Sequence, residues 1–299
     1  MLFNAVTDSY KGVVLMKYLI INADDFGLHE TVNLGIIDGY TSGCITSTSI
    51  MASGKAFEHA VLLAAANPQL GVGVHLTLVG ANSVCEPNQI TSLVDNEGNL
   101  APKYPQFLLR YMLGRVHLSD IRKELTAQVQ KVVDSGIHIT HLDSHQHMHI
   151  VPGISDITID IAQKFGVKAV RIPREPYCFV GGFPCTPMRI IARGGLTCLA
   201  QLASKKIRKC GISMPEHFFG MLAGGNMQEE FLLKIIDALP DGISEIMMHP
   251  GSNNEVLNQN FNWNYHGEEE LAAVKSEELR CRLAHNNITL ISFKDIPYG

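Results

Sequence analysis

The sequence predicts an α/β protein whose single domain is a βα barrel, seven-stranded and distorted. Apolar runs rich in β-branched residues recur along the chain, helical patterns separate several of them, and 299 residues suit one large barrel. Strands that alternate with helices of this length pair in parallel through right-handed crossovers. A doubly wound open sheet shares this alternation, and we favour the barrel.

The expected elements follow one another in a regular order. Seven apolar, β-branched runs are interpreted as strands: 18–23, 45–51, 71–78, 137–142, 168–172, 243–248 and 288–293. Apolar residues at helical spacing predict helices at 31–40, 119–133, 155–165, 227–239 and 268–284. Two stretches, 80–118 and 174–225, interrupt this order. Long insertions in a compact domain are usually lids or binding loops.

Composition excludes several classes of protein. Hydrophobic residues make up 46% and charged residues 18% of the chain, which is typical of a globular protein and not of a disordered or collagen-like one. The formal charge of -5 arises from mixed signs without long runs, so no dominant phosphate-binding surface is indicated. We therefore do not expect nucleic acid as a partner.

Cysteine usage and the N-terminus indicate a cytoplasmic protein. The seven cysteines include no Cys-x-x-Cys pair and form no compact framework, so we expect them to be reduced. The N-terminus lacks the charged start and continuous apolar core of a signal peptide. Met16 directly precedes a strand-like run, so we expect residues 1–15 to be an extension outside the fold and 16–299 to form the domain. No stretch of 18 apolar residues predicts a membrane span.

Two adjacent carboxylates, Asp24 and Asp25, come where the first apolar run stops. In a βα barrel the carboxyl ends of the strands form the active face, so both side chains are expected to project into it. Adjacent carboxylates repel, and one of them normally needs a cation or a raised pKa. The alternative interpretation is a turn in which Asp caps the following helix.

A histidine, His75, interrupts the apolar run GVGVHLTL. Such a residue can be a metal ligand, but it is more often a core histidine whose ring is hydrogen bonded. By itself it does not indicate function.

The segment HITHLDSHQHMHI carries the main chemical signal. His141, Asp143, His145, His147 and His149 recur at a spacing of two, so an extended chain would point all five to one face. Four imidazoles and a carboxylate on one face suit a divalent cation and the groups that orient its ligands. A polar face on an edge strand and a helix with histidines at a spacing of four are the alternatives.

Two further strand ends carry polar side chains. His249 follows the run EIMM and precedes a Pro-Gly turn, so it either faces the site or lies in solvent at the strand end. Arg171, Arg174 and Glu175 follow the run AV at another expected strand end. An arginine there can orient a carboxylate or bind a sugar hydroxyl, and a structural ion pair is the alternative.

Taken together, these motifs resemble the YdjC-like family of carbohydrate deacetylases, which includes chitooligosaccharide deacetylases and hopanoid-biosynthesis-associated deacetylases. The matching pieces are NADDFG (22–27), GVHLTL (73–78), HLDSHQHMH (141–149) and MMHPG (247–251), in the family's order. The segments RIPREP, HFFGMLAGGNM and LPDGISEIMMHPG are more similar to the hopanoid-associated branch.

The resemblance implies a barrel of the glycoside hydrolase/deacetylase type that holds one divalent metal ion, Mg²⁺ or Zn²⁺. It implies Asp25, His75 and His145 as the protein ligands and Asp24 as the general base. Imidazole ligands favour zinc, whereas magnesium prefers oxygen. Because an amine leaves only when protonated, a general acid is also needed, and His249 is the candidate.

The remaining polar residues at the site are expected to contact substrate or to orient the ligands. They are Asp143, His147, His149, Arg171 and Glu175.

We therefore expect a hydrolase that removes the acetyl group from an N-acetylated carbohydrate or glycolipid. Another metal-dependent hydrolase on the same barrel, such as a sugar-phosphate or phosphoester hydrolase, is the main alternative, since fold does not determine function. A sugar-binding or metal-binding protein without turnover is the second. No Gly-x-Ser-x-Gly motif supports a serine nucleophile. A homodimer is compatible with the sequence.

Overall fold

The computed structural model describes residues 16–177, 181, 183–184, 186–261 and 264–297, so the expected extension, residues 1–15, lies outside the described residues. The named strands of the described chain form one parallel sheet in the order β4-β3-β2-β1-β6-β5, and β7 pairs with the start of β1. Their bounds are β1 (Lys17–Phe26), β2 (Ser47–Ile50), β3 (Gly71–Leu76), β4 (Ile139–Ser144), β5 (His217–Phe219), β6 (Gly242–Met248) and β7 (Ile288–Leu290).

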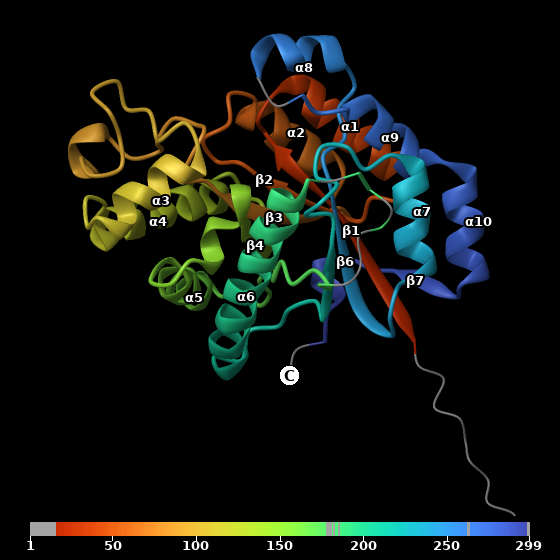
Figure 1. Ribbon diagram of the computed structural model, residues 1–299. Helices are drawn as coiled ribbons and strands as arrows, with labels where there is room; N and C mark the ends of the chain where they lie inside the picture. The colour runs from red at the N-terminus through yellow and green to blue at the C-terminus, as the bar shows by residue number, and fades with distance from the viewer. Residues whose placement is uncertain (1–15, 178–180, 182, 185, 262–263, 298–299) are drawn as a thin grey trace, which may run out of the picture.

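Six of the seven expected runs form strands, and one does not. Residues 168–172 form only isolated parallel bridges, Leu142 to Val170 and Ala169 to Ser213. The remaining strand, β5, lies inside the stretch that the sequence predicted to be an insertion. The sheet is curled (Figure 1), and its end strands are β4 and β5. The fold is therefore α/β with a curled parallel sheet, and the named strands do not by themselves close a barrel.

Helices cover the sheet on its outer sides. They are α1 (Glu30–Thr41), α2 (Phe57–Ala66), α3 (Tyr104–Met112), α4 (Leu118–Asp134), α5 (Ile154–Phe165), α6 (Pro187–Lys209), α7 (Glu229–Asp237), α8 (Asn254–Asn260), α9 (Gly267–Lys275) and α10 (Glu277–His285). Short 3₁₀ turns are η1 (Pro87–Gln89), η2 (His145–Ile150) and η3 (Phe293–Asp295). No helix in the described ranges is long and apolar enough to cross a membrane.

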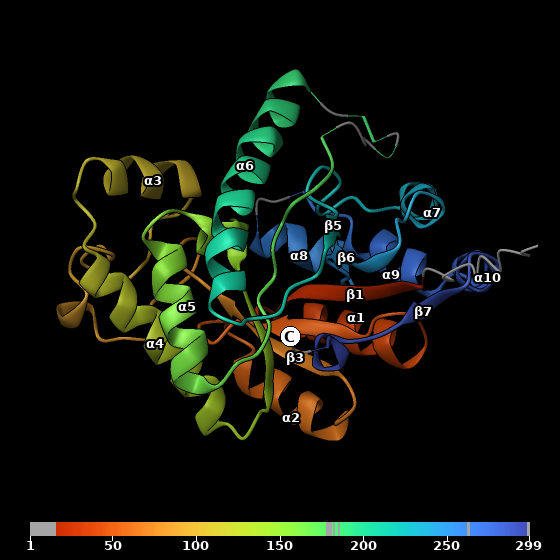
Figure 2. The same cartoon turned by 90° about the horizontal axis from the view of Figure 1, so that it is seen from below.

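Two expectations about the helices were incomplete. The single helix expected at 268–284 is two helices, α9 and α10, because Ser276 ends the first and its hydroxyl accepts the Leu279 N–H at 3.2 Å as the cap of the second. The stretch 174–225 contains α6, a helix of 23 residues. In Figure 2, α3 and the N-terminal part of α6 rise on the same side of the sheet.

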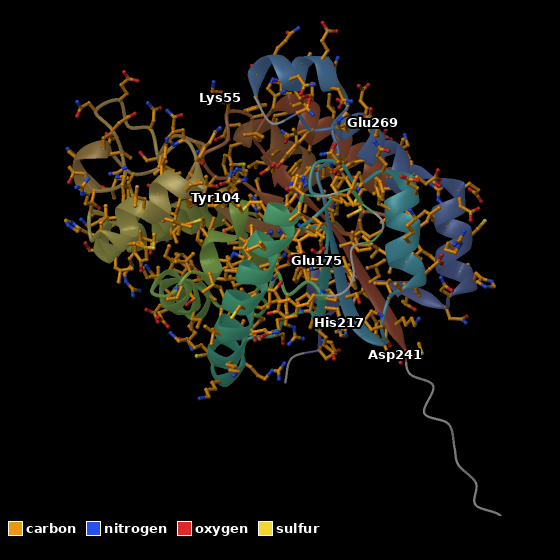
Figure 3. The ribbon with its side chains drawn as sticks, in the orientation of Figure 1. Lys55, Tyr104, Glu175, His217, Asp241 and Glu269 are labelled. Carbon is orange, nitrogen blue, oxygen red and sulfur yellow. The ribbon has the colours of Figure 1, made fainter. Side chains whose placement is uncertain are left out.

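Strand β1 lies in the middle of the sheet and is buried on both faces. Leu19, Ile20 and Ile21 are fully buried: Leu19 and Ile21 belong to the main core, and Ile20 packs with Phe293 and Ile296 on the other face. Figure 3 shows the common direction of the strands: Asp241, just before β6, is at the bottom of the view, and Lys55, after β2, is at the top. The parallel arrangement therefore brings the carboxyl ends of β1, β3, β4 and β6 to one edge.

Candidate functional site

The end of β1 turns its two carboxylates into different surroundings. The pairing of β1 with β2 is irregular between Ala23 and Phe26, and Asp25 has a φ of 66°. This left-handed conformation is accessible to Asp more readily than to β-branched residues. The turn closes where the Leu28 N–H donates to the Asp25 carbonyl at 3.0 Å. Neither carboxylate caps α1, because its N-cap is His29, so the capping alternative is wrong.

Asp25 lies between two histidines from different strand ends. Its Oδ1 is 3.1 Å from His145 Nδ1 and 3.4 Å from His75 Nε2. One ligand atom from each of these three buried residues lies within 4.8 Å of the others, so the group could hold a metal ion. A carboxylate with two imidazoles is a donor set that suits a divalent transition metal, with positions left for water and substrate.

Charge at this group favours cation binding. Burial alone would raise the pKa of Asp25, but His145 and His75 hold it well below its usual range, so the side chain is an anion. Burial alone would lower the pKa of His75, but Asp143 and Asp24 raise it to about 9. In the metal-free protein His75 therefore carries a second proton, which a bound cation would displace.

Asp143 sets the orientation of His75. Its Oδ1 accepts a hydrogen bond from His75 Nδ1 at 2.8 Å, which leaves Nε2 directed toward Asp25. Metal-binding histidines commonly donate their second N–H to a carboxylate in this way, which fixes the tautomer and the ring orientation. The Ser49 hydroxyl donates to the other oxygen of Asp143 at 2.8 Å. Asp143 therefore supports the candidate ligand and does not line the cavity.

Arg171 is fully buried and ties three carboxylates together. Its Nη2 and Nη1 each lie 2.7 Å from an oxygen of Asp24, Nη1 lies 2.6 Å from Asp143, and Nε lies 2.7 Å from Glu245. This pairing holds the plane of the Asp24 carboxylate, which Asn22 also contacts through Nδ2 at 2.9 Å. Burial raises the pKa of Glu245 to about 8, although Arg171 opposes this shift.

Three members of this network were missed by the sequence analysis: Asn22, Ser49 and Glu245. Two of them carried a signal in the strand period, because side chains two apart share a face. Asn22 precedes Asp24 by two positions, and Glu245 precedes His249 by four. Ser49 offered no such signal, since its partners come from other strands.

The histidine-rich segment does not stay extended. Strand β4 ends at Ser144, and the chain enters η2, where Gln146 and His147 have φ values of 55° and 57°. The expectation that alternation continues to His149 is therefore wrong, and so is the helical alternative. The histidines of the segment therefore have different partners. His145 Nδ1 contacts Asp25, while the His141 ring stacks on the Phe293 ring with 3.7 Å between the centroids.

The last two histidines of the segment have different surroundings. His147 lines the cavity, and its ring meets the edge of Phe218 at 5.7 Å between centroids. Burial holds its pKa well below the usual value. His149 is held by Ser144 Oγ at 2.6 Å and by the Arg171 carbonyl oxygen at 2.9 Å, and burial lowers its pKa to about 4. Both rings are thus neutral, and a direct substrate contact by His149 stays a prediction.

Glu175 supports a wall of the cavity indirectly. Its Oε1 accepts the N–H groups of Gly220 at 2.9 Å and Met221 at 3.2 Å, directly after β5. Figure 3 shows Glu175 and Tyr104 on opposite sides of α6. Met221 lines the cavity and Glu175 does not, so the side chain of Glu175 positions backbone and its expected substrate contact stays a prediction.

Two members of the candidate metal group, His75 and His145, line a cavity of about 710 Å³. Asp24, His147 and His249 also line it. The walls are mostly apolar and come from α3, η2 and the residue after it, α6, β6 and the segment after β5. They include Leu108, Met112, Met148, Val151, Leu196, Leu199, Met221 and Met247. The helix α6 and the wall residue Tyr265 were not anticipated from the sequence.

His249 lies directly after β6 and faces the cavity. Its ring packs at 61° against Tyr265, with 5.1 Å between the centroids. Its backbone N–H donates to Glu270, a fully buried residue of α9 that also accepts the Met227 N–H at 2.9 Å. This carboxylate fixes the turn after β6, so His249 is held at the cavity and is not a solvent-exposed strand-end residue.

Known proteins share this sequence pattern and fold. A model of the family described as YdjC-like protein matches residues 18–285. A carbohydrate deacetylase of Brevibacillus brevis is 30% identical over 285 residues, which cover 93% of this chain and 99% of the relative. One of Clostridium beijerinckii is 30% identical over 279 residues, with the same two coverages. A candidate cellobiose-phosphate cleavage protein of Enterococcus faecalis has a similar structure, with a TM-score of 0.74, 23% identity and coverage of 94% of this chain and 99% of that one.

Proposed function

This chain belongs to the YdjC-like protein family, and from that premise we propose that it is a metal-dependent hydrolase that removes the acetyl group from an N-acetylated sugar. The sugar is an oligosaccharide or a glycolipid. Relatives named carbohydrate deacetylase match nearly the whole chain, which supports the proposal. The observation that carries it is the buried group of Asp25, His75 and His145, whose two histidines line the cavity.

These three residues would hold one divalent ion, Zn²⁺ or Mg²⁺. Their donor atoms converge, Asp25 is ionised, and His75 is oriented through Asp143. Two imidazole ligands favour zinc over magnesium. A divalent ion bound there supplies positive charge that lowers the pKa of a water molecule and polarises a carbonyl oxygen.

Asp24 is the proposed general base. It lines the cavity beside the candidate ligands, with Oδ2 4.0 Å from His75 Nε2. Arg171 and Asn22 hold its carboxylate, so its orientation costs little further entropy when substrate binds. The carboxylate accepts a proton from the attacking water, a role that commonly accounts for about 10²- to 10⁴-fold in rate.

His249 is the proposed general acid. Cleavage of an amide requires a proton on the departing nitrogen, and an imidazole can supply one near neutral pH. His249 faces the same cavity as Asp24, and Glu270 and Tyr265 hold its backbone and ring. His147, neutral and on the cavity wall, is available to hydrogen bond a sugar hydroxyl.

The test is acetate release from N-acetylated oligosaccharides and glycolipids, measured before and after chelation and after metal is restored. We expect release that requires metal. We also expect Asp24→Asn to retain the metal, measured by elemental analysis, and to lose about 10²- to 10⁴-fold in rate, because an amide cannot accept the proton. Loss of the metal in this variant would make Asp24 a ligand. Phosphate release from a sugar phosphate without acetate release would support the alternative hydrolase.

We propose in addition that residues 16–299 form one domain with an incompletely closed barrel. The bridges of Leu142 to Val170 and of Ala169 to Ser213 continue the row of strands beyond β4 toward the residues that precede β5. These bridges are too short to form a regular strand, which accounts for the distortion.

A further inference from the structure

Exposed apolar side chains gather on two segments that flank the cavity, residues 98–119 and 186–202, which we call the rim. Of the 14 large hydrophobic side chains exposed in the described chain, nine belong to the rim. They are Tyr104, Leu109, Met112, Leu113, Leu118, Met188, Ile190, Ile191 and Leu202. Scattered single exposures need no explanation, whereas a concentration of this kind marks an interaction surface.

The helices of the rim turn apolar side chains to solvent at helical spacing. At the end of α3, Leu109, Met112 and the C-cap residue Leu113 follow the i, i+3, i+4 pattern, and Met112 is 75% exposed. In α6, Met188 and Ile191 are 73% and 68% exposed. A helix of a globular protein usually directs such a stripe to the core, and no described part of the chain covers these side chains.

The rim borders the cavity itself. The two helices supply facing parts of its wall, Leu108 and Met112 from α3 and Leu196 and Leu199 from α6. Met112 belongs to both the wall and the exposed surface. In Figure 2 the two helices rise from the sheet on the same side, away from α2. Whatever covers the rim therefore lies next to the cavity.

The rim is also basic. It contains five lysines and arginines and no acidic residue, although the whole chain has a formal net charge of -5. Of the five, Arg193 is buried beside Glu175 and Arg110 is half-buried. Lys103, Arg115 and Arg189 are exposed on it. A two-fold dimer through this face would bring the same positive surface together from both subunits, which like-charge repulsion disfavours. A negatively charged partner with an apolar interior fits both properties.

We propose that the rim docks on an anionic lipid bilayer. Side chains such as Leu113 and Ile191 enter the boundary between headgroups and acyl chains, and the basic residues contact the lipid phosphates. Apolar insertion combined with attraction to anionic headgroups is the way in which interfacial helices bind membranes. Docking places the cavity of the site next to the lipid surface.

The first test is co-sedimentation of the full chain with vesicles of phosphatidylcholine alone or mixed with phosphatidylserine. We expect the protein to sediment with the mixed vesicles and to be largely released by high salt, because exposed charge pairs are screened. Failure to sediment with phosphatidylserine vesicles at low salt would overturn the proposal.

A double variant, Leu113→Glu with Ile191→Glu, tests whether the rim is the surface that contacts the membrane. Neither residue lines the cavity, and both are exposed, so the fold should tolerate the change. We expect its partition onto mixed vesicles to fall by about tenfold or more, since two inserted side chains become charged. The matched control is Leu34→Glu with Leu62→Glu on α1 and α2, which adds the same charge elsewhere and should bind like the wild type.

Three outcomes would contradict the proposal that the rim docks on a membrane. Unchanged binding by the rim variant, or an equal loss in the control, would show that this face does not make the contact. Sedimentation velocity gives the third: a wild-type dimer that the rim variant converts to a monomer would assign the face to a second copy of the chain.

Discussion

Replacing Asp143 with asparagine tests how the candidate metal ligands are held in place. Asp143 is fully buried and accepts hydrogen bonds from His75 Nδ1 at 2.8 Å and Ser49 at 2.8 Å, while Arg171 Nη1 lies 2.6 Å away. Asn has nearly the same shape but no charge, and its NH₂ group must face at least one of these three donors. The variant therefore loses one contact and weakens the ion pair.

The magnitude follows from these contacts. Breaking a buried ion pair by removing one partner costs about 3 to 5 kcal/mol of folding free energy. Arg171 keeps Asp24 and Glu245, so we expect a loss near the lower limit of that range, about 3 kcal/mol. A group that orients a metal-binding histidine commonly contributes about 10- to 100-fold to metal affinity, or about 1.4 to 2.7 kcal/mol.

Calorimetric titration of the chelator-treated protein with Zn²⁺ and Mg²⁺ measures the affinity, and urea unfolding in chelator measures the stability separately. The matched control is Asp24→Asn, which removes a charge from the same Arg171 but leaves His75 Nδ1 paired. We expect only Asp143→Asn to weaken metal binding. Unchanged affinity in Asp143→Asn, or an equal loss in both variants, would refute the assignment of His75 as an oriented ligand.

The other predictions concern the acid, the buried histidines and close packing. His249→Ala should slow N-deacetylation far more than hydrolysis of an activated acetyl ester, whose leaving group needs no proton; both rates are measured by acetate release. Burial lowers the pKa of His141 to about 3 and of His149 to about 4, so both stay neutral in the folded protein while the unfolded chain protonates near pH 6.5. The free energy of unfolding therefore has its full value above pH 6.5. As the pH falls from 6.5 toward 4, we expect it to decrease by about 1.4 kcal/mol per pH unit for each histidine, measured by urea unfolding. Gly73→Ala would place a Cβ within 2.3–2.5 Å of three His141 ring atoms and should cost about 1 to 3 kcal/mol or more in the same assay. Gly195→Ala, in α6 with no neighbouring atom within 4 Å, should instead stabilise by up to about 1 kcal/mol.

Each of these predictions has a contrary result. Equal losses on amide and ester would make His249 a binding residue. Stability that does not change between pH 6.5 and pH 5 would mean that the buried rings are not kept neutral. A harmless Gly73→Ala would mean that His141 can leave its position against β3 without cost.

The amino-acid sequence by itself determined the type of fold and which residues could meet. Apolar runs and helical spacing depend on local geometry, so they predicted six of the strands and the helices α1, α4, α5 and α7. In a parallel sheet all strands end at the same edge, and this simple rule was enough to expect Asp24, Asp25 and His249 at the active edge. The resemblance to the family added His75 and His145 as ligands, and local geometry did not predict the place of His145.

Tertiary structure decided where β4 ends and what surrounds the carboxylates. The side chain of Ser144 accepts the His149 N–H at 2.9 Å and holds the turn that directs His145 to Asp25, and this turn overrides the strand-like alternation of the segment. Arg171 meets Asp24 on β1, Asp143 on β4 and Glu245 on β6. Two strands separate β4 from β1 in the sheet, so this network exists only in the folded chain.

The cavity was also a product of tertiary structure. One of its walls, α6, lies in a stretch that the sequence predicted only to be an insertion. The run 168–172 formed only a pair of bridges, while β5 took a place in the sheet. Periodicity reports how a segment can bury its own side chains, but a cavity wall, an ion-pair network and the last strand of a sheet depend on what packs against them. Residues distant in sequence supplied those contacts, and so only the folded chain could reveal them.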